Sequence, residues 1–181
     1  MPSRFTTTRL LLAPLLAACG TIPTPTVSLP DASVPLANTF ITQGKVVYVD
    51  QDALRGSSLP AALQGLTIRG DALYNASGGN LSTVKLYVRP TLDGLDGRCT
   101  RVAGLLGAPT IYACDPQDET AQGIGTLTVK AGVAVPFTLS GAGLDTSARS
   151  GHGYFGFQVL TGTAIQGETV DLTKLKAQAR L

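Results

Sequence analysis

The feature that most constrains this fold is the alternation of apolar and polar side chains in short segments of the chain. In Ser82–Arg89, the aliphatic residues Val84, Leu86 and Val88 occupy every second position, and Pro90 ends the segment. Successive side chains of a β-strand point to opposite faces of the sheet, so this pattern places the three aliphatic side chains on one face. We therefore expect a β-strand here.

Similar segments recur along the chain and are separated by turn-forming residues. The cluster NASGGN, Asn75–Asn80, is the strongest of these turn signals. Pro136 cannot donate a ladder hydrogen bond, which predicts an edge or bulged strand around it. The other segments that we expect to be strands are Phe40–Val49, Leu66–Ile68, Leu73–Tyr74, Thr110–Cys114, Gly125–Lys130, Val133–Leu139 and Tyr154–Leu160.

The carboxyl-terminal segment TKLKAQARL consists largely of good helix formers. However, its apolar residues alternate strictly with charged or amide side chains. A helix would distribute the apolar residues around its circumference, whereas a strand places them on one face. We therefore expect a strand with one apolar face, formed by Leu175, Ala177, Ala179 and Leu181.

Eight or nine short strands without a convincing helix predict an all-β fold, either an antiparallel sandwich or a barrel. We prefer an immunoglobulin-like β-sandwich that spans residues 38–181. The composition agrees with this class, since the chain has 21 Gly and only 14% charged residues, against about a quarter in average proteins. The chain has no Trp, so the buried Trp of antibody domains is absent.

The amino terminus has the organisation of an export signal. Arg4 and Arg9 precede an apolar run, Leu10–Ala18, which is shorter than the roughly 20 residues that cross a bilayer. The run ends in LAAC, Leu16–Cys19, which resembles the lipobox of bacterial lipoproteins. The resemblance covers residues 1–20 only. The alternative is an ordinary signal peptide, residues 1–18, that happens to be followed by a cysteine.

The resemblance implies that the chain is cut before Cys19 and that the Cys19 thiol carries a diacylglyceryl group, usually with acylation of the new amino terminus. Two or three acyl chains satisfy the requirement for stable anchoring. Gly20 stands where an Asp can retain a lipoprotein in the inner membrane. We therefore expect a cell-envelope location, and the outer membrane in a cell with two membranes.

Residues 19–37 are expected to be the lipidated cysteine and a tether. The segment is rich in Pro and Thr and has one charge, Asp31, which predicts an extended polyproline II conformation. An edge strand laid along the domain is the alternative, and we prefer the tether at least for residues 20–30.

The charge balance excludes some partners. Removing residues 1–18 takes away two of the 14 basic side chains and none of the 12 acidic ones, so the mature chain is formally neutral. A neutral chain is not expected to bind nucleic acid or a membrane through a polybasic patch.

After lipidation of Cys19, two cysteines remain, Cys99 and Cys114. In an exported protein such a pair predicts a disulfide. Their spacing is too short for the sheet-bridging disulfide of antibody domains, so we expect it to pin a local loop or hairpin. Two reduced buried thiols or a metal site are the alternatives.

This disulfide would draw two acidic segments together, one on each side of it. Carboxylates on flexible turns are the ligands that calcium prefers, although acids in turns are commonly only solvated. The weak calcium candidates are Asp93, Asp96, Asp115, Asp118 and Glu119. No other cofactor is expected, apart from the covalent lipid.

No catalytic motif is present. His152 and Ser150 lie two residues apart, but no nucleophile-elbow sequence surrounds the serine, so a loop histidine is the preferred interpretation. The glycine pairs Gly123/Gly125 and Gly141/Gly143 lack the further glycine that a nucleotide-binding loop needs. We expect a protein that is not an enzyme.

Together these observations predict a lipid-anchored envelope protein whose sandwich is a structural or protein-interaction module. Its partner would be an envelope protein or polymer. The alternatives are a carrier of a small apolar ligand and, less favoured, an envelope hydrolase that uses two of the carboxylates.

Overall fold

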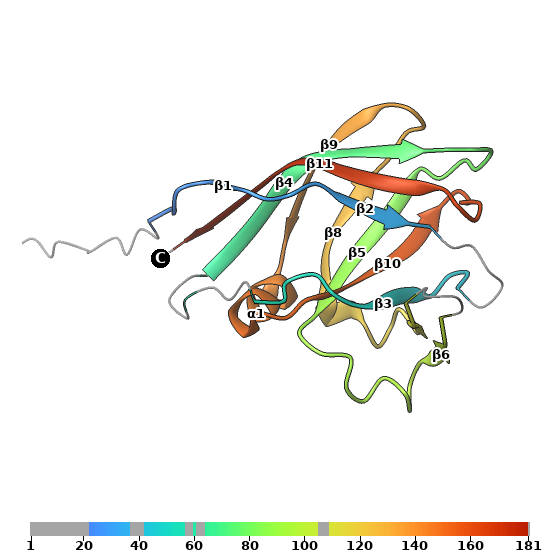
Figure 1. Ribbon diagram of the computed structural model, residues 1–181, viewed down its shortest axis with the longest axis horizontal. Helices are drawn as coiled ribbons and strands as arrows, with labels where there is room; N and C mark the ends of the chain where they lie inside the picture. The colour runs from blue at the N-terminus through green and yellow to red at the C-terminus, as the bar shows by residue number, and fades with distance from the viewer. Residues whose placement is uncertain (1–21, 37–41, 57–59, 61–63, 105–108, 181) are drawn as a thin grey trace, which may run out of the picture.

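The computed structural model describes residues 22–36, 42–56, 60, 64–104 and 109–180. The described chain forms two antiparallel sheets, which face one another as the layers of a sandwich (Figure 1). The first sheet contains β1 (Val27–Ser28), β2 (Ala32–Pro35), β4 (Gln64–Asn75), β9 (Ala134–Ser140) and β11 (Thr169–Arg180). The second contains β3 (Val46–Asp52), β5 (Thr83–Arg89), β6 (Thr100–Val102), β7 (Ile111–Cys114), β8 (Gly123–Thr128) and β10 (Tyr154–Thr161).

The predicted all-β sandwich is confirmed, and the described residues form eleven strands where eight or nine were expected. In the first sheet the order is β1-β11-β4-β9, and β2 also pairs with β11. The second sheet has the order β6-β7-β3-β10-β5-β8. As Pro136 predicted, β9 lies at an edge of its sheet.

The main core lies between the sheets and is formed by the apolar faces that the alternation predicted. Val84, Leu86 and Val88 of β5 are all buried, and Leu127 of β8 and Phe157 of β10 pack in the same cluster. A second, smaller core covers the outer face of the second sheet, where Tyr48, Tyr87 and Tyr112 pack with Leu95 and Cys114. This outer core explains why β5 is buried on both faces.

The carboxyl-terminal segment is a strand, as expected, but it belongs to a longer one. β11 begins at Thr169, and its register with β4 shifts between Thr173 and Lys176. Lys174, at this bulge, has φ 53°, in the left-handed region. A bulge adds one residue, so Leu172 before it and Leu175 after it are both buried in the main core. Leu181 lies outside the described residues.

The expected free tether is corrected by the structure for residues 22–36. β1 pairs with β11 through Val27 and Ala177, and β2 pairs with β11 from Ala32 to Pro35. The alternative of an edge strand is therefore the one observed. Proline is tolerated at a sheet edge because only one side of such a strand is hydrogen-bonded. Residues 19–21 and 37 lie outside the described part of the chain.

The expectation that no helix forms is also corrected. α1 (Ala142–Ser150) packs against β4 and β5 at one end of the sandwich, next to the short 3₁₀ turn Thr120–Gln122. Leu144 and Ala148, four residues apart, bury its apolar face. Gly151 ends the helix in the left-handed conformation, φ 72°, as glycine commonly does after a last helical turn.

Candidate functional site

The lipobox residues, including Cys19, lie outside the described residues, so lipidation stays a prediction. In the described part of the chain, no helix is long and apolar enough to cross a membrane.

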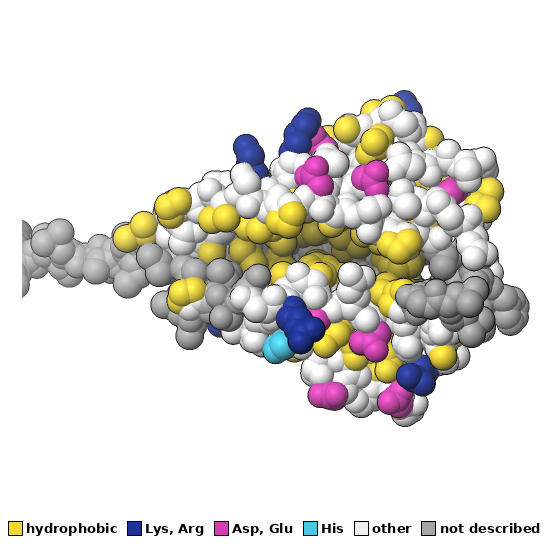
Figure 2. All heavy atoms as spheres, in the orientation of Figure 1, with side chains coloured by type: hydrophobic (Ala, Val, Ile, Leu, Met, Phe, Trp, Pro, Cys, Tyr) yellow, Lys and Arg dark blue, Asp and Glu magenta, His cyan; other side chains and the backbone are white. Residues whose placement is uncertain are grey.

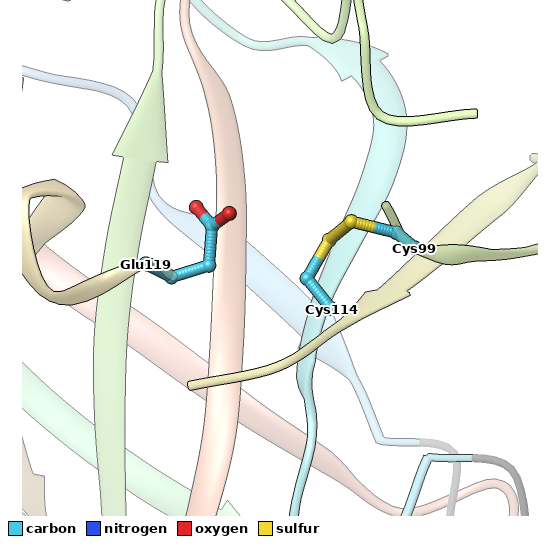
Figure 3. A group of neighbouring side chains, drawn as sticks. All are labelled: Cys99, Cys114 and Glu119. Atoms are coloured by element: carbon cyan, nitrogen blue, oxygen red, sulfur yellow. A yellow bond between two sulfur atoms is a disulfide. The ribbon is translucent and has the colours of Figure 1, made fainter. Parts of the chain in front are cut away.

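The predicted disulfide between Cys99 and Cys114 is present and joins the ends of the hairpin formed by β6 and β7. Thr100 pairs with Ala113 in this hairpin, which places the two cysteines opposite one another. The bridge therefore pins a local hairpin within one sheet, as the spacing predicted. Figure 3 shows that the side chain of Glu119 is a close neighbour, and one of its carboxylate oxygens lies within 4.8 Å of both sulfur atoms.

This group does not fit a metal ion. Both sulfur atoms are bonded to each other, so neither is available as a thiolate ligand. In addition, both carboxylate oxygens of Glu119 already accept hydrogen bonds from other side chains. Oε2 accepts hydrogen bonds from Arg89 Nε at 2.8 Å and from the Tyr48 hydroxyl at 2.7 Å, while Oε1 accepts one from Arg89 Nη2 at 2.8 Å.

Burial and hydrogen bonding in this cluster change the pKa values of Tyr48 and Arg89. Burial raises the pKa of Tyr48, and its hydrogen bond to Glu119 raises it further. The hydrogen bond from Arg89 to Glu119 raises the pKa of the guanidinium. Arg89 therefore stays charged and fixes Glu119 as a structural carboxylate.

The structure does not gather the other calcium candidates into a site. Asp93, Asp96, Asp115 and Asp118 are exposed. Asp115 accepts a hydrogen bond from Lys45 at 3.4 Å, and Asp96 lies 3.8 Å from Arg101. In the described residues, none of these four acids joins a group of three ligand atoms with metal-binding spacing.

The histidine has a carboxylate partner that the sequence analysis missed. His152 Nδ1 lies 2.6 Å from Asp52 Oδ2, and Asp52 Oδ1 accepts hydrogen bonds from the backbone of Leu54 and Gly153. Burial raises the pKa of Asp52, but these hydrogen bonds outweigh it and lower the pKa overall. Ser150 Oγ instead donates to the Ser147 carbonyl oxygen at 2.8 Å. The Ser150 hydroxyl therefore serves the helix end, and His152 and Asp52 form a carboxylate–histidine pair of which this hydroxyl is not a part.

Another feature with binding potential is an apolar cleft between the sheets. The sandwich is closed on one side, where consecutive strands β8 and β9 pack together. On the other side the sheets diverge, and Figure 2 shows a hollow between them with a largely hydrophobic floor. Six apolar residues that pack against the main core are only half-buried. We infer that they line this cleft and call them the cleft residues: Leu29, Val34, Ile111, Phe155, Val159 and Ala177.

The cleft deepens into a cavity of ≈ 230 Å³ near the start of β3 and the end of β10. Its apolar walls are Val47, Phe157 and Val159, and its rim includes Thr42 and Lys45. Val47 and Phe157 are neighbours in the ladder between β3 and β10, and both face the main core. The cavity is therefore an extension of the space between the sheets.

No protein-family model, curated protein or solved structure matches this chain. Its function is accordingly inferred from its own residues.

The two glycine pairs serve the fold. Gly125 has φ 155°, and a Cβ there would lie 2.9 Å from the Leu139 side chain. Gly141 caps α1 with φ 149° and packs against the Gly123 carbonyl oxygen. Both pairs are thus explained by close backbone packing.

Proposed function

We propose that this chain is a lipid-anchored protein of the bacterial cell envelope, and that its β-sandwich is a structural or protein-interaction module rather than an enzyme. The lipobox resemblance at Cys19 supports the anchor, and Gly20 supports the outer membrane in a cell with two membranes. The formal neutrality of the mature chain favours envelope protein or polymer partners over nucleic acid.

The observation that supports the interaction module is the exposed apolar surface of the edge segment 22–36. This segment exposes Ile22 and Val27, at 66% and 59% of their surface. Exposed apolar surface beside a sheet edge is typical of interaction sites.

A second candidate, favoured by the cavity at the end of the cleft, is a carrier of a small apolar ligand. Concave apolar sites with a few polar groups at the rim are typical of ligand pockets.

Mild-detergent extraction of the tagged full chain, native gel separation and mass spectrometry of the band distinguish the two. If the sandwich is an interaction module, a stoichiometric envelope partner should co-purify with it. Val27→Asp should reduce the amount of partner in the band, whereas Val133→Asp on the closed side should leave it unchanged. A lone protein with the added mass of a small molecule would instead favour the carrier. A lone protein with no added mass would contradict both.

A further inference from the structure

We propose that the cleft binds the extended acyl chain of a membrane lipid, a proposal that rests on the lipid anchor inferred above.

The shape of the cleft favours a long, narrow ligand. The cleft residues follow the strand directions, with Ala177 near one end of β11 and Val34 paired with Val170 near the other. From Val170 to Ala177 the strand rises roughly 20 Å. A groove of this length between two sheets is suited to an extended hydrocarbon chain.

The lining of the cleft favours hydrocarbon over a polar ligand. Five of the six cleft residues carry branched aliphatic or aromatic side chains, and the sixth is Ala177. Inward-facing side chains of a sandwich are normally fully buried, because the opposite sheet covers them. Here the divergence of the sheets leaves them in partial contact with water, and an apolar ligand would remove that contact.

The position of the anchor indicates the source of the ligand. Pro23 pairs with Arg180 at the end of β11, three residues beyond Ala177. Three residues lie between Cys19 and Pro23, so four residue steps limit the distance between their Cα atoms to about 14 Å. A lipid on Cys19 would therefore hold this end of the cleft close to the bilayer surface, where acyl chains are the abundant apolar ligands.

The polar end of the bound lipid would remain outside the cleft. At the far end, Lys45 on the cavity rim lies 3.4 Å from Asp115, so its charge is already balanced. The described residues that line the cavity thus offer no unpaired cation for an anionic headgroup, and its apolar walls are suited to the methyl end of the chain.

The test uses the mature chain, residues 19–181, with Cys19→Ser, which carries neither the apolar run Leu10–Ala18 nor a lipid, and the fluorescent fatty acid cis-parinaric acid as the probe. We expect saturable binding with one site per chain and displacement by palmitate. Val159→Asp places a carboxylate in the cleft and should weaken binding about tenfold or more. Val133→Asp, an equal change at a residue 43% exposed on the closed side, should bind as the parent does.

Absence of saturable binding to the folded parent chain would overturn the proposal without any variant. Equal weakening by Val159→Asp and Val133→Asp would overturn it too, provided that thermal melting shows both variants folded. The anchor is tested separately, since a wild-type protein without lipid on Cys19 would contradict the proposed function while the binding assay still reports on the cleft.

Discussion

The guanidinium of Arg89 and the carboxylate of Glu119 form a buried, two-point ion pair on the outer face of the second sheet. The two N–O distances are both 2.8 Å, and 12% of the Arg89 side chain and 1% of the Glu119 side chain are exposed. The pair ties β5 to the loop after the disulfide, and the Arg89 guanidinium also lies 5.7 Å from the centre of the Tyr48 ring.

Removal of one member of this pair should strongly destabilise the protein. Arg89→Met leaves Glu119 buried without its counter-charge, which typically costs about 3–5 kcal/mol of unfolding free energy. Urea denaturation measures this loss, and Arg98→Met, at an exposed arginine in the same region, is the control. The double variant Arg89→Met/Glu119→Gln should lose less than the sum of the single changes; strict additivity would show that the two residues act independently.

A second buried carboxylate, Glu168, should make stability depend on acid pH. Burial raises its pKa, but hydrogen bonds from Tyr74 and from backbone N–H groups, including those of Ser77, Gly79 and Ile165, outweigh burial and lower it well below the usual range. A carboxyl group with a lowered folded-state pKa stabilises the fold above its unfolded pKa, near 4.5, and this contribution is lost as pH falls towards the folded value.

Glu168→Gln should therefore lower the melting temperature by several degrees at pH 7, because an amide N–H₂ group would face backbone donors. Its melting temperature should also fall less steeply than that of the wild type below pH 4.5. Thermal melts between pH 2 and pH 7 measure both effects. Asp118→Asn, at an exposed acid, is the control, and parallel wild-type and Glu168→Gln profiles would contradict the assignment.

The turn around Gly79 should not accept a side chain. A Cβ at this position would collide with the Tyr74 hydroxyl and the Glu168 carboxylate, and would lie 2.7 Å from the Thr163 carbonyl oxygen. Gly79→Ala should lower the melting temperature by several degrees. Gly97→Ala, where no atom lies within 4 Å of the added Cβ, should change it little. Similar melting temperatures for the two variants would mean that this turn is not tightly packed.

The disulfide should stabilise the hairpin and the outer core above it. The cysteines are 15 residues apart, and closing such a loop contributes about 3 kcal/mol in the chain-entropy model. The double variant Cys99→Ser/Cys114→Ser should lose roughly this amount in equilibrium denaturation. The oxidised and reduced wild type should differ by a similar amount, and equal stability of the two forms would refute the expectation.

The period-two alternation was sufficient to predict most strands and the class of fold. It was not sufficient for β1 and β2, because residues 22–36 lack a regular pattern and become strands only by pairing with β11. The segments around Leu66 and Leu73 form one strand, β4, since their pairing with β9 continues between them. The helix was missed because α1 has only nine residues and a short apolar face.

The candidate site was less predictable, because it depends on residues far apart in sequence. The disulfide could be predicted from the number of cysteines that remain after Cys19. Asp52 and His152, in contrast, are 100 residues apart, and local spacing does not report such a contact. The cleft depends on the divergence of the two sheets, whereas alternation indicates only which side chains face inward. The acids near the disulfide were correctly placed in turns, but Arg89, the partner of Glu119, belongs to another strand.

The lipid anchor is the central claim, and intact-mass spectrometry of the protein purified from membranes tests it most directly. The account predicts the mass of residues 19–181 plus a diacylglyceryl group on Cys19, with or without one amide-linked acyl chain. Cys19→Ser should remove this added mass. A wild-type chain with no lipid, or one whose amino terminus is not Cys19, would contradict the account.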